Sequence, residues 1–262
     1  MKKEKDSVLG SNDMTLVVGD VHISQGQNLR RAKWLGAAIE DIRPNRVLFI
    51  GDFLTFDALS AWDKNKRAKM EGRRYQKDID AGNKFLGAMY SEMSDVALMD
   101  TQFILTEGNH EERLWRYLDE DPTFKGAVDY RVDLDIEDWT IVPYKEYYIH
   151  RGIHFTHVPF NKARPIGGKY AVHRALEFHQ HSVIFGHTHE LSSAGLHRTG
   201  AAHLSQSLSV GCYFEHTDDY AVGTVTNYWR GILLIDHYKL GRFGWQPLSM
   251  GKMRRYYNAK RK

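Results

Sequence analysis

The sequence has little cysteine, little proline and no long apolar run. Its one cysteine, Cys212, cannot form an intramolecular disulfide, which excludes a disulfide-rich scaffold and makes a reducing cytoplasm the expected compartment. No apolar run approaches the ~20 residues needed to span a bilayer, and the first residues lack the apolar core of a signal peptide. We therefore expect a cytoplasmic protein without membrane contact, in which Cys212 is a small buried hydrophobic residue.

The composition of the 262 residues is typical of a globular protein. Hydrophobic residues make up 42% and charged residues 26%, which is ample for one large α/β domain with a buried core. The net charge is +3, and the last eleven residues carry six Lys/Arg and no acid. Because the sequence has no internal repeat and no Pro/Gly/Ser-rich linker, we expect a single domain over residues 1–251 and a disordered basic tail over residues 252–262.

In the first half, short apolar strands alternate with helices. Apolar runs predict strands at 14–18, 46–50 and 102–106, and Asn28 is a candidate cap for a helix that ends near residue 42. A polar, helical and basic insertion follows at about 57–100. Strands joined by helical crossovers indicate a parallel sheet with helices on its faces.

The second half is dominated by short strands. Residues 147–150 and 153–156 predict a hairpin, followed by a helix near 168–180 and a strand at 182–185. A closing hairpin is predicted from 231–238 and 241–247. The fold class is therefore α/β, with helices concentrated in the first half and antiparallel strands in the second.

Polar side chains follow the apolar strands of both halves. Asp20 and His22 are two positions apart, as are His187 and His189, and positions i and i+2 of an extended chain face the same way. Each pair is therefore expected to present two ligands to one place. Three further candidates also follow apolar strands: Asp52, Asn109 and His157.

These side chains are expected to meet in one cleft, because ligands bind at the carboxyl ends of strands in open α/β sheets. Two carboxylates, one amide oxygen and four imidazoles are too many ligands for one ion and suit two ions that share a bridging carboxylate. Mixed nitrogen and oxygen ligands without thiolate favour Mn, Fe, Zn, Co or Ni. Taken singly, each motif also fits a structural role, as an Asx turn or a helix cap.

Five motifs in a fixed order resemble the calcineurin-like metallophosphoesterase superfamily. They are Asp20-Val-His22, Gly51-Asp52, Gly108-Asn-His-Glu111, His157 and Gly186-His-Thr-His189. The resemblance covers about two thirds of the chain and implies a four-layer double β-sandwich flanked by helices.

The resemblance also implies a role for each residue. The first metal is held by Asp20, His22 and His189, and the second by Asn109, His157 and His187. Asp52 bridges the two ions. His110 is a catalytic residue that binds no metal and gives a proton or a hydrogen bond to the leaving oxygen.

The sequence departs from the family pattern after the bridging carboxylate. Thr55 and Phe56 stand where the Ser/Thr phosphatase and diadenosine-tetraphosphatase branches have Asp and Arg. The missing Arg removes a bidentate grip on a terminal phosphate, and the missing Asp removes the partner that orients His110, for which Asp57 is a substitute candidate. These absences favour a phosphodiesterase or nuclease over a phosphoprotein phosphatase.

The assignment of His157 has two competitors. Val158 follows it where Gly is common in the family, and His150 and His154 lie on the same predicted hairpin. Either one is an alternative ligand of the second metal.

The insertion is a candidate substrate-binding region because it is rich in cations. Seven Lys/Arg lie between Asp63 and Asp78 against three acids, and basic stretches with aromatics bind phosphates and bases. A solvated helix face is the alternative. Trp62 and Tyr75 border this stretch as packing anchors, which we favour, or as stacking platforms. The residues expected to contact substrate are Lys64, Arg67, Arg73 and Arg74.

The sequence thus predicts an enzyme that hydrolyses phosphate esters with two divalent metal ions, Mn first among them, and a metal-bridging hydroxide. A phosphodiesterase is the first hypothesis, with nucleic acid as a candidate substrate. The alternatives are a phosphomonoesterase or nucleotide pyrophosphatase acting on a small phosphorylated substrate, and a metal-free scaffold of the same fold. The oligomeric state is not predicted.

Overall fold

A computed structural model describes residues 13–197, 204–216 and 226–261. Its first sheet has the strand order β13-β12-β1-β2-β3-β4. The neighbours from β1 to β4 pair in parallel, whereas β12 is antiparallel to both β1 and β13. The strands are β1 (Met14–Val18), β2 (Arg46–Phe49), β3 (Gln102–Thr106), β4 (Thr140–Val142), β12 (Gly231–His237) and β13 (Phe243–Ser249).

The second sheet has the strand order β10-β11-β9-β6-β5. Its strands are β5 (Tyr148–His150), β6 (Ile153–Thr156), β9 (Ser182–Phe185), β10 (Leu191–His197) and β11 (Leu204–Val210), and a small separate ribbon pairs β7 (Phe160–Asn161) with β8 (Arg164–Pro165). Contrary to the sequence prediction, this half is not wholly antiparallel, because β9 pairs in parallel with both β6 and β11. A helical crossover between β6 and β9 returns the chain in the same direction.

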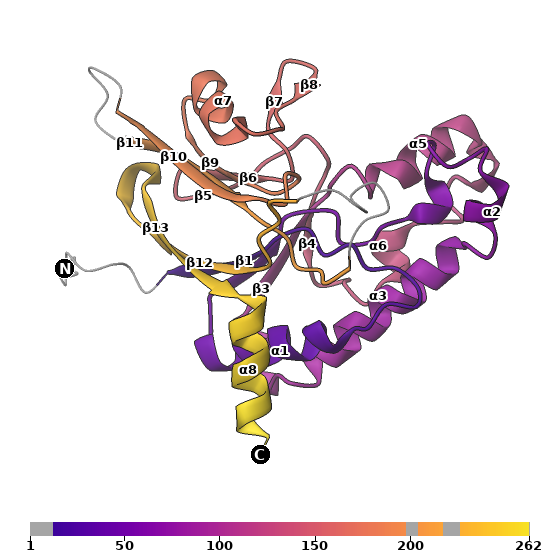
Figure 1. Cartoon of the computed structure of the whole chain (residues 1–262), viewed down its shortest axis with the longest axis horizontal. Helices are drawn as coiled ribbons and strands as arrows, with labels where there is room; N and C mark the ends of the chain where they lie inside the picture. The colour runs from indigo at the N-terminus through magenta and orange to yellow at the C-terminus, as the bar shows by residue number, and fades with distance from the viewer. Residues whose placement is uncertain (1–12, 198–203, 217–225, 262) are drawn as a thin grey trace.

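Helices cover the outer faces of both sheets. Figure 1 shows α7 over the second sheet, with α1, α3 and α8 beneath the first. The helices are α1 (Arg30–Ile42), α2 (Arg67–Met70), α3 (Tyr75–Tyr90), α4 (Asp95–Asp100), α5 (Glu112–Glu120), α6 (Tyr130–Asp133), α7 (Ala171–Phe178) and α8 (Met250–Lys260), with short 3-10 turns η1 (Asp57–Leu59), η2 (Pro122–Phe124) and η4 (Lys239–Gly241). None of the described helices has the length and apolar content required to cross a bilayer.

Three apolar cores separate the layers. Alternate residues of β1 face opposite ways, so Leu16 and Val18 pack toward the helices while Val17 packs between the sheets. A third core lies between α7 and the second sheet, where Val172 meets Phe185 and their neighbours. The predicted four-layer arrangement, helices on sheet on sheet on helix, is therefore confirmed.

The predicted elements of the first half are close to those observed. β1 and β3 have the predicted bounds, and β2 is one residue shorter than predicted. α1 begins at Arg30 with Leu29 at its N-cap, so Asn28 is not the cap. The Asn28 side chain instead accepts a hydrogen bond from the backbone N–H of Arg30, at 3.0 Å.

The prediction of a disordered tail was wrong, because residues 250–260 form α8. Ser249 caps this helix by accepting a hydrogen bond from the backbone N–H of Lys252. Met250 and Met253 are buried in the core that also contains α1, and the Tyr257 hydroxyl donates to Glu92 at 2.8 Å. The spacing of these apolar residues is helical, and the cations Lys260 and Arg261 are paired with Asp41 and Glu92.

Candidate metal centre

The seven predicted ligand side chains converge at the carboxyl ends of the strands. Asp20, Asp52 and Asn109 follow β1, β2 and β3, and the predicted histidines follow β1, β6 and β9. Five of the seven line a cleft of about 790 Å³, while Asp20 and His157 are fully buried beneath its floor. Chain segments far apart in sequence thus supply one site.

The first group of ligand atoms consists of Asp20, His22 and His189. Asp20 Oδ2 lies 2.9 Å from His189 Nε2 and 3.9 Å from His22 Nε2. The two Nε2 atoms are 3.3 Å apart. All three side chains are buried, so their polar atoms face one another rather than solvent.

The second group consists of Asp52, His157 and His187, with Asn109 beside it. His157 Nε2 lies 3.1 Å from Asn109 Oδ1 and 3.4 Å from Asp52 Oδ2. The same Asp52 oxygen is 3.8 Å from Nε2 of His22, which belongs to the first group. Asp52 therefore lies between the two groups.

The expectation that residues two apart serve one place was wrong for His187 and His189. They belong to different groups, and both have left-handed backbone conformations, with φ of 66° and 58°. His22 and Asp52 also have positive φ, 48° each. Such strained conformations in non-glycine residues cost about 1–3 kcal/mol each and gather at functional sites. The extended geometry assumed from sequence does not apply here.

Backbone groups fix the orientation of these ligands. Asp20 Oδ1 accepts a hydrogen bond from the His187 N–H at 3.0 Å, and Asp52 Oδ1 accepts one from the His110 N–H at 2.9 Å. His157 Nδ1 donates to the carbonyl of Ile50 at 2.9 Å. In each case one atom is held by the backbone, and the other polar atom of the side chain is left to face the site.

Two motif glycines permit the close approach of the carboxylates. A Cβ atom at Gly108 would fall on the Asp52 carboxylate, and one at Gly186 would fall on that of Asp20. The glycines of these motifs are therefore required by contact between backbone and ligand, in addition to any turn geometry.

Glu111 is a functional residue whose importance the sequence did not indicate. Its buried carboxylate accepts four backbone hydrogen bonds, from Asp52, Phe53, Leu54 and Gly108, at 2.8 to 3.2 Å. It therefore ties the loop after β2 to the loop after β3, which are the loops that carry Asp52 and Asn109. The last position of the Gly-Asn-His-Glu motif was the available signal.

His110 is oriented by a backbone carbonyl rather than by the predicted Asp57. Its Nδ1 donates to the Thr55 carbonyl at 2.7 Å. Arg113 donates to the same carbonyl at 2.7 Å and to His110 Nε2 at 3.1 Å, whereas Asp57 lies 3.6 Å from Arg113. Arg113 was not predicted to contact His110. The available signal was its position three residues after His110, because residues three apart are neighbours where a helix begins.

Burial and mutual charge shift the pKa values of the cluster. Burial disfavours the Asp52 anion, yet His110 and His157 hold the pKa of Asp52 well below its usual value. Burial lowers the pKa of His22 to about 3 and that of His187 to about 4. Burial also opposes a charge on His157, but Asp52 raises the pKa of His157 to about 10. Anionic carboxylate beside neutral imidazole is the protonation state that metal binding requires, and His157 has to lose a proton to reach it.

The donor atoms fit two divalent ions. Two nitrogens each roughly 2.1 Å from an ion, at tetrahedral or octahedral angles, lie about 3.0–3.4 Å apart, and the Nε2 atoms of His22 and His189 are 3.3 Å apart. Two compact groups that share the Asp52 oxygen correspond to two sites with one bridging ligand. The set contains imidazole and oxygen and no thiolate, as in sites for Mn, Fe, Zn, Co or Ni.

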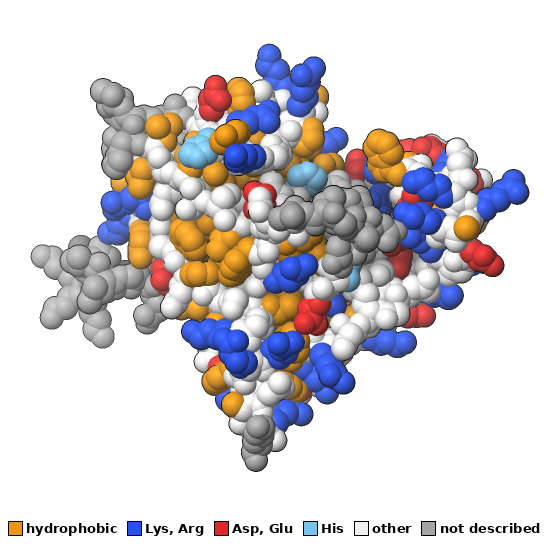
Figure 2. All heavy atoms as spheres, in the orientation of Figure 1, with side chains coloured by type: hydrophobic (Ala, Val, Ile, Leu, Met, Phe, Trp, Pro, Cys, Tyr) orange, Lys and Arg blue, Asp and Glu red, His pale blue; other side chains and the backbone are white. Residues whose placement is uncertain are grey.

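Of the four cations predicted to contact substrate, the structure brings Arg73 alone into the cleft wall. Lys64 pairs with Glu120 at 3.1 Å, and Arg74 donates to the carbonyl of Arg73 at 2.7 Å. Arg67 is exposed and is not among the described residues that line the cleft. Figure 2 shows Lys and Arg side chains gathered at the end of the molecule that carries α2.

Residues of the insertion that were not predicted to contact substrate line the cleft in place of Lys64, Arg67 and Arg74. Lys66 and Lys69 line the cleft together with Trp62. Trp62 is 88% exposed, so its interpretation as a packing anchor was wrong. Tyr75 does pack, because its ring stacks on buried Phe56 with 5.7 Å between centroids.

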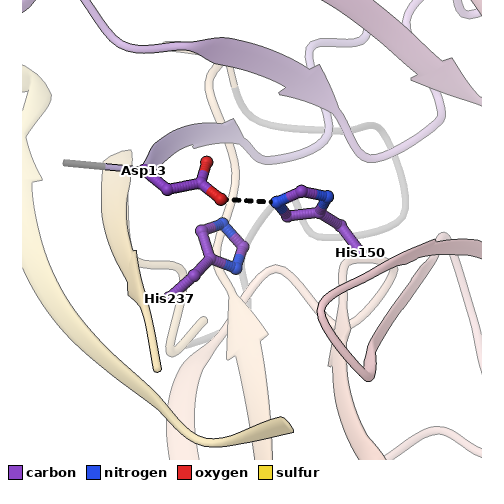
Figure 3. Close-up of side chains that lie close together, drawn as sticks. All are labelled: Asp13, His150 and His237. Carbon is purple, nitrogen blue, oxygen red and sulfur yellow. Dashed lines mark hydrogen bonds and ion pairs between the residues drawn. The ribbon is translucent and has the colours of Figure 1, made fainter. Parts of the chain in front are cut away.

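Asp13, His150 and His237 form a separate cluster (Figure 3). It lies where β1 begins and where β5 and β12 end, whereas the predicted ligands follow the ends of β1, β2 and β3. Asp13 accepts a hydrogen bond from His150 at 2.8 Å and also pairs with Arg46 and Arg151. Two guanidinium groups already neutralise this carboxylate, so we interpret the cluster as an ion-pair network that joins the two sheets. His150 is thereby removed as a competitor of His157.

His154 is likewise distant from the ligand groups. Its ring stacks on that of His181 with 4.6 Å between centroids, and it belongs to neither group. Cys212 is fully buried, as predicted.

Comparison with known proteins gives one family. The family model described as calcineurin-like phosphoesterase matches residues 14–191, which is more than half of the chain and includes all seven converging side chains. A search of the curated proteins found no match.

Proposed function

The chain belongs to the calcineurin-like phosphoesterase family, and on that basis we propose that it is a two-metal phosphodiesterase that acts on nucleic acid. Membership implies hydrolysis of phosphate esters, and the diester substrate is our proposal. The observation that supports it most is the position of Asp52, whose Oδ2 lies 3.8 Å from His22 in one ligand group and 3.4 Å from His157 in the other.

Asp20, His22 and His189 hold the first ion in this proposal, and the second group holds the other. Its ligands are Asn109, His157 and His187, with Asp52 shared between the two ions. When bound, a pair of divalent ions lowers the pKa of water and neutralises the oxygens of a phosphoryl group. We propose Mn as the native metal, with Fe, Zn, Ni and Co as alternatives for the same donor set.

His110 is proposed to give a proton or hydrogen bond to the leaving oxygen. The Thr55 carbonyl accepts from Nδ1, so Nε2 is the atom that faces the cleft. Nε2 lies 3.8 Å from Asp52 Oδ2. Burial lowers the pKa of His110, and the negative charge of Asp52 offsets only part of that shift. Arg113 and a protonated Nε2 would direct hydrogens at each other, so Arg113 then turns its guanidinium toward the substrate phosphate.

The form of the cleft supports a diester. The cleft extends from the ligand groups past Arg113 to Trp62 and the insertion, leaving room for a substituent on more than one oxygen of the phosphate. Phe56, which stands where other branches have a phosphate-binding Arg, is fully buried against Tyr75 and does not reach substrate.

One observation favours a phosphomonoesterase or a nucleotide pyrophosphatase instead. Arg113 supplies a guanidinium beside His110 from a different part of the chain, and guanidinium binds a terminal phosphate well. The absence of Arg at position 56 is therefore weaker evidence for a diesterase over a monoesterase than the sequence alone suggested.

The test is hydrolysis of a substrate panel by Mn²⁺-supplemented protein. We expect bis-p-nitrophenyl phosphate and oligonucleotides to be cleaved faster than p-nitrophenyl phosphate, and Asp52→Asn to lose at least about 100-fold in kcat/KM. Asp119→Asn, which changes an exposed carboxylate paired with Lys125 outside the cleft, is the matched control. Preference for the monoester would support the alternative, and full activity of Asp52→Asn would reject the two-metal mechanism. Absence of both activity and bound metal would support a scaffold.

A further inference from the structure

A second hollow of the surface lies between α1, α3 and α8. It has a volume of about 550 Å³, and its apolar lining consists of Leu29, Trp34, Ala88 and the ring of Tyr257. Trp34 belongs to the core beneath the first sheet, and the other three residues pack against that core. This lining is therefore a fixed part of the fold. We call the hollow the α1–α8 groove.

Three cations line the α1–α8 groove: Arg30 and Lys33 from α1, and Arg254 from α8. All three are exposed, and none of their side chains forms an ion pair or hydrogen bond with a residue that the structure describes. The other polar lining residues are the amides Asn28 and Asn258, and no acidic residue of the described ranges lines the groove. The groove therefore has three positive charges and no negative one.

The acids of the adjoining surface do not cancel this charge. Tyr257 also lines a smaller hollow, in which three carboxylates lie. Each carboxylate has a cation of its own, in the ion pairs Glu40–Arg43, Asp41–Lys260 and Glu92–Arg261. Figure 2 shows Lys and Arg side chains around the part of the molecule that carries α8. The α1–α8 groove thus belongs to a face on which positive charge is in excess.

A third hollow, of about 330 Å³, connects the α1–α8 groove to the cleft. Ser24 and Gln27 line both this hollow and the cleft, and Leu29 lines both this hollow and the groove. The charged residues of the connecting hollow are Lys77, Lys84 and Asp80. Two cations and one acid leave one positive charge. The surface path over residues 24–29 therefore leads from the candidate metal centre to the groove without a hollow that is negative overall.

We propose that the α1–α8 groove binds the phosphate backbone of a nucleic-acid strand that extends out of the cleft. This inference rests on the proposed function, because the scissile phosphate of the same strand then lies at the candidate metal centre. Exposed cations without neighbouring acids bind phosphates with release of counterions. A small phosphorylated ligand would occupy a single hollow. A strand carries a phosphate at every nucleotide, so it fits a path of three hollows that share lining residues.

Turnover gives the first test. The ratio of kcat/KM for a single strand of about 30 nucleotides to that for a dinucleotide is measured with Mn²⁺-loaded enzyme, because one binding face covers up to about 16 nucleotides. The double variant Lys33→Gln/Arg254→Gln keeps residues of similar helix propensity. We expect it to lower the ratio at least about tenfold, since two charge-assisted contacts are lost. Lys64→Gln/Lys125→Gln removes the same charge from pairs outside the groove and should leave the ratio at its wild-type value.

Binding gives a second test that needs neither turnover nor added metal. Anisotropy of the labelled strand is measured over a range of salt concentrations. The double variant in the groove should reduce the slope of log affinity against log salt by about 1.4, since each phosphate contact on a single strand contributes about 0.7. The double variant outside the groove should retain the wild-type slope.

Cross-linking gives a third test, which locates the strand. Cys212 is fully buried, so a thiol-linked photo-crosslinker attaches to a cysteine introduced at the surface. We expect Asn258→Cys, in the groove, to cross-link the strand of about 30 nucleotides and not the dinucleotide. Thr123→Cys, at an exposed position of η2, is the control and should cross-link neither.

The outcomes separate this inference from the proposed function. A wild-type ratio and salt slope in Lys33→Gln/Arg254→Gln, or equal cross-linking from positions 258 and 123, would overturn the groove as a nucleic-acid site. Binding of vesicles that contain phosphatidylserine, without binding of the strand, would also overturn it. Hydrolysis of bis-p-nitrophenyl phosphate together with any of these results would leave the phosphodiesterase standing. Strand binding that depends on the groove, without hydrolysis of any ester, would support the groove and reject the proposed activity.

Discussion

The Nε2 atoms of His22 and His189 lie 3.3 Å apart, although 167 positions separate the two residues in the chain. Two buried imidazole nitrogens at this distance, with the Asp20 carboxylate 2.9 Å from one of them, form a candidate ligand group for a cation. His187 is two positions from His189 and belongs to the other group. The Gly-His-Thr-His turn therefore contributes to both candidate groups.

This division predicts that His187→Ala and His189→Ala each remove one metal ion. After loading with Mn²⁺ and removal of excess ion, wild-type protein should contain about two ions per chain by mass spectrometry and each variant about one. His173→Ala, which changes an exposed histidine on α7, should retain two. Two ions in both ligand variants would show that these histidines do not bind metal.

Glu111→Gln is predicted to destabilise the protein. The amide NH₂ would face backbone N–H groups that now donate to a carboxylate oxygen, and buried donors without acceptors cost about 2–4 kcal/mol in free energy of unfolding. Urea denaturation measures this loss. Glu112→Gln, at the neighbouring half-buried position, should change the free energy by less than about 0.5 kcal/mol. Equal effects of the two variants would contradict the role given to Glu111.

Gly108→Ala is predicted to abolish metal binding. The added methyl group would fall on the Asp52 carboxylate, which must move away from the site. Gly87→Ala is the matched control, because a Cβ at Gly87 in α3 meets no atom within 4 Å and alanine favours a helix by up to about 1 kcal/mol. Metal content and thermal unfolding of both variants check this. A Gly108→Ala protein with two bound ions would contradict it.

The Asp13 ion-pair network predicts a dependence of stability on pH. Burial opposes the Asp13 anion, but hydrogen bonds from Arg46 and His150 outweigh it and hold the pKa of Asp13 below its ordinary value of 3.8. A carboxyl whose folded pKa is depressed contributes stability above the ordinary value and loses that contribution as the pH falls below it.

Asp13→Asn should therefore be less stable than wild type at pH 6, and the difference in free energy of unfolding should shrink as the pH falls from about 5 to 3. Denaturation of both proteins across this range measures the difference. A difference that stays constant with pH would mean that the contribution of Asp13 to stability does not come from its charge.

Sequence patterns predicted the fold and singled out the side chains that the structure brings together, because both depend on local signals. Apolar runs such as Met14–Val18 end directly at the motif residues, so strand prediction and ligand prediction support each other. The exposed position of Trp62 and the burial of Met253 in α8 depend on contacts with distant segments, which periodicity does not report. The different destinations of His187 and His189 depend on backbone conformations that residue spacing does not encode.

Electron paramagnetic resonance of the Mn²⁺-loaded protein tests whether Asp52 bridges two ions. Two ions that share the Asp52 carboxylate would lie about 3.5–4 Å apart, so we predict two Mn²⁺ per chain with the spectrum of a magnetically coupled pair, and loss of the coupling in Asp52→Asn. A six-line spectrum of isolated Mn²⁺, or no bound ion, in the wild-type protein would contradict a bridging role of Asp52.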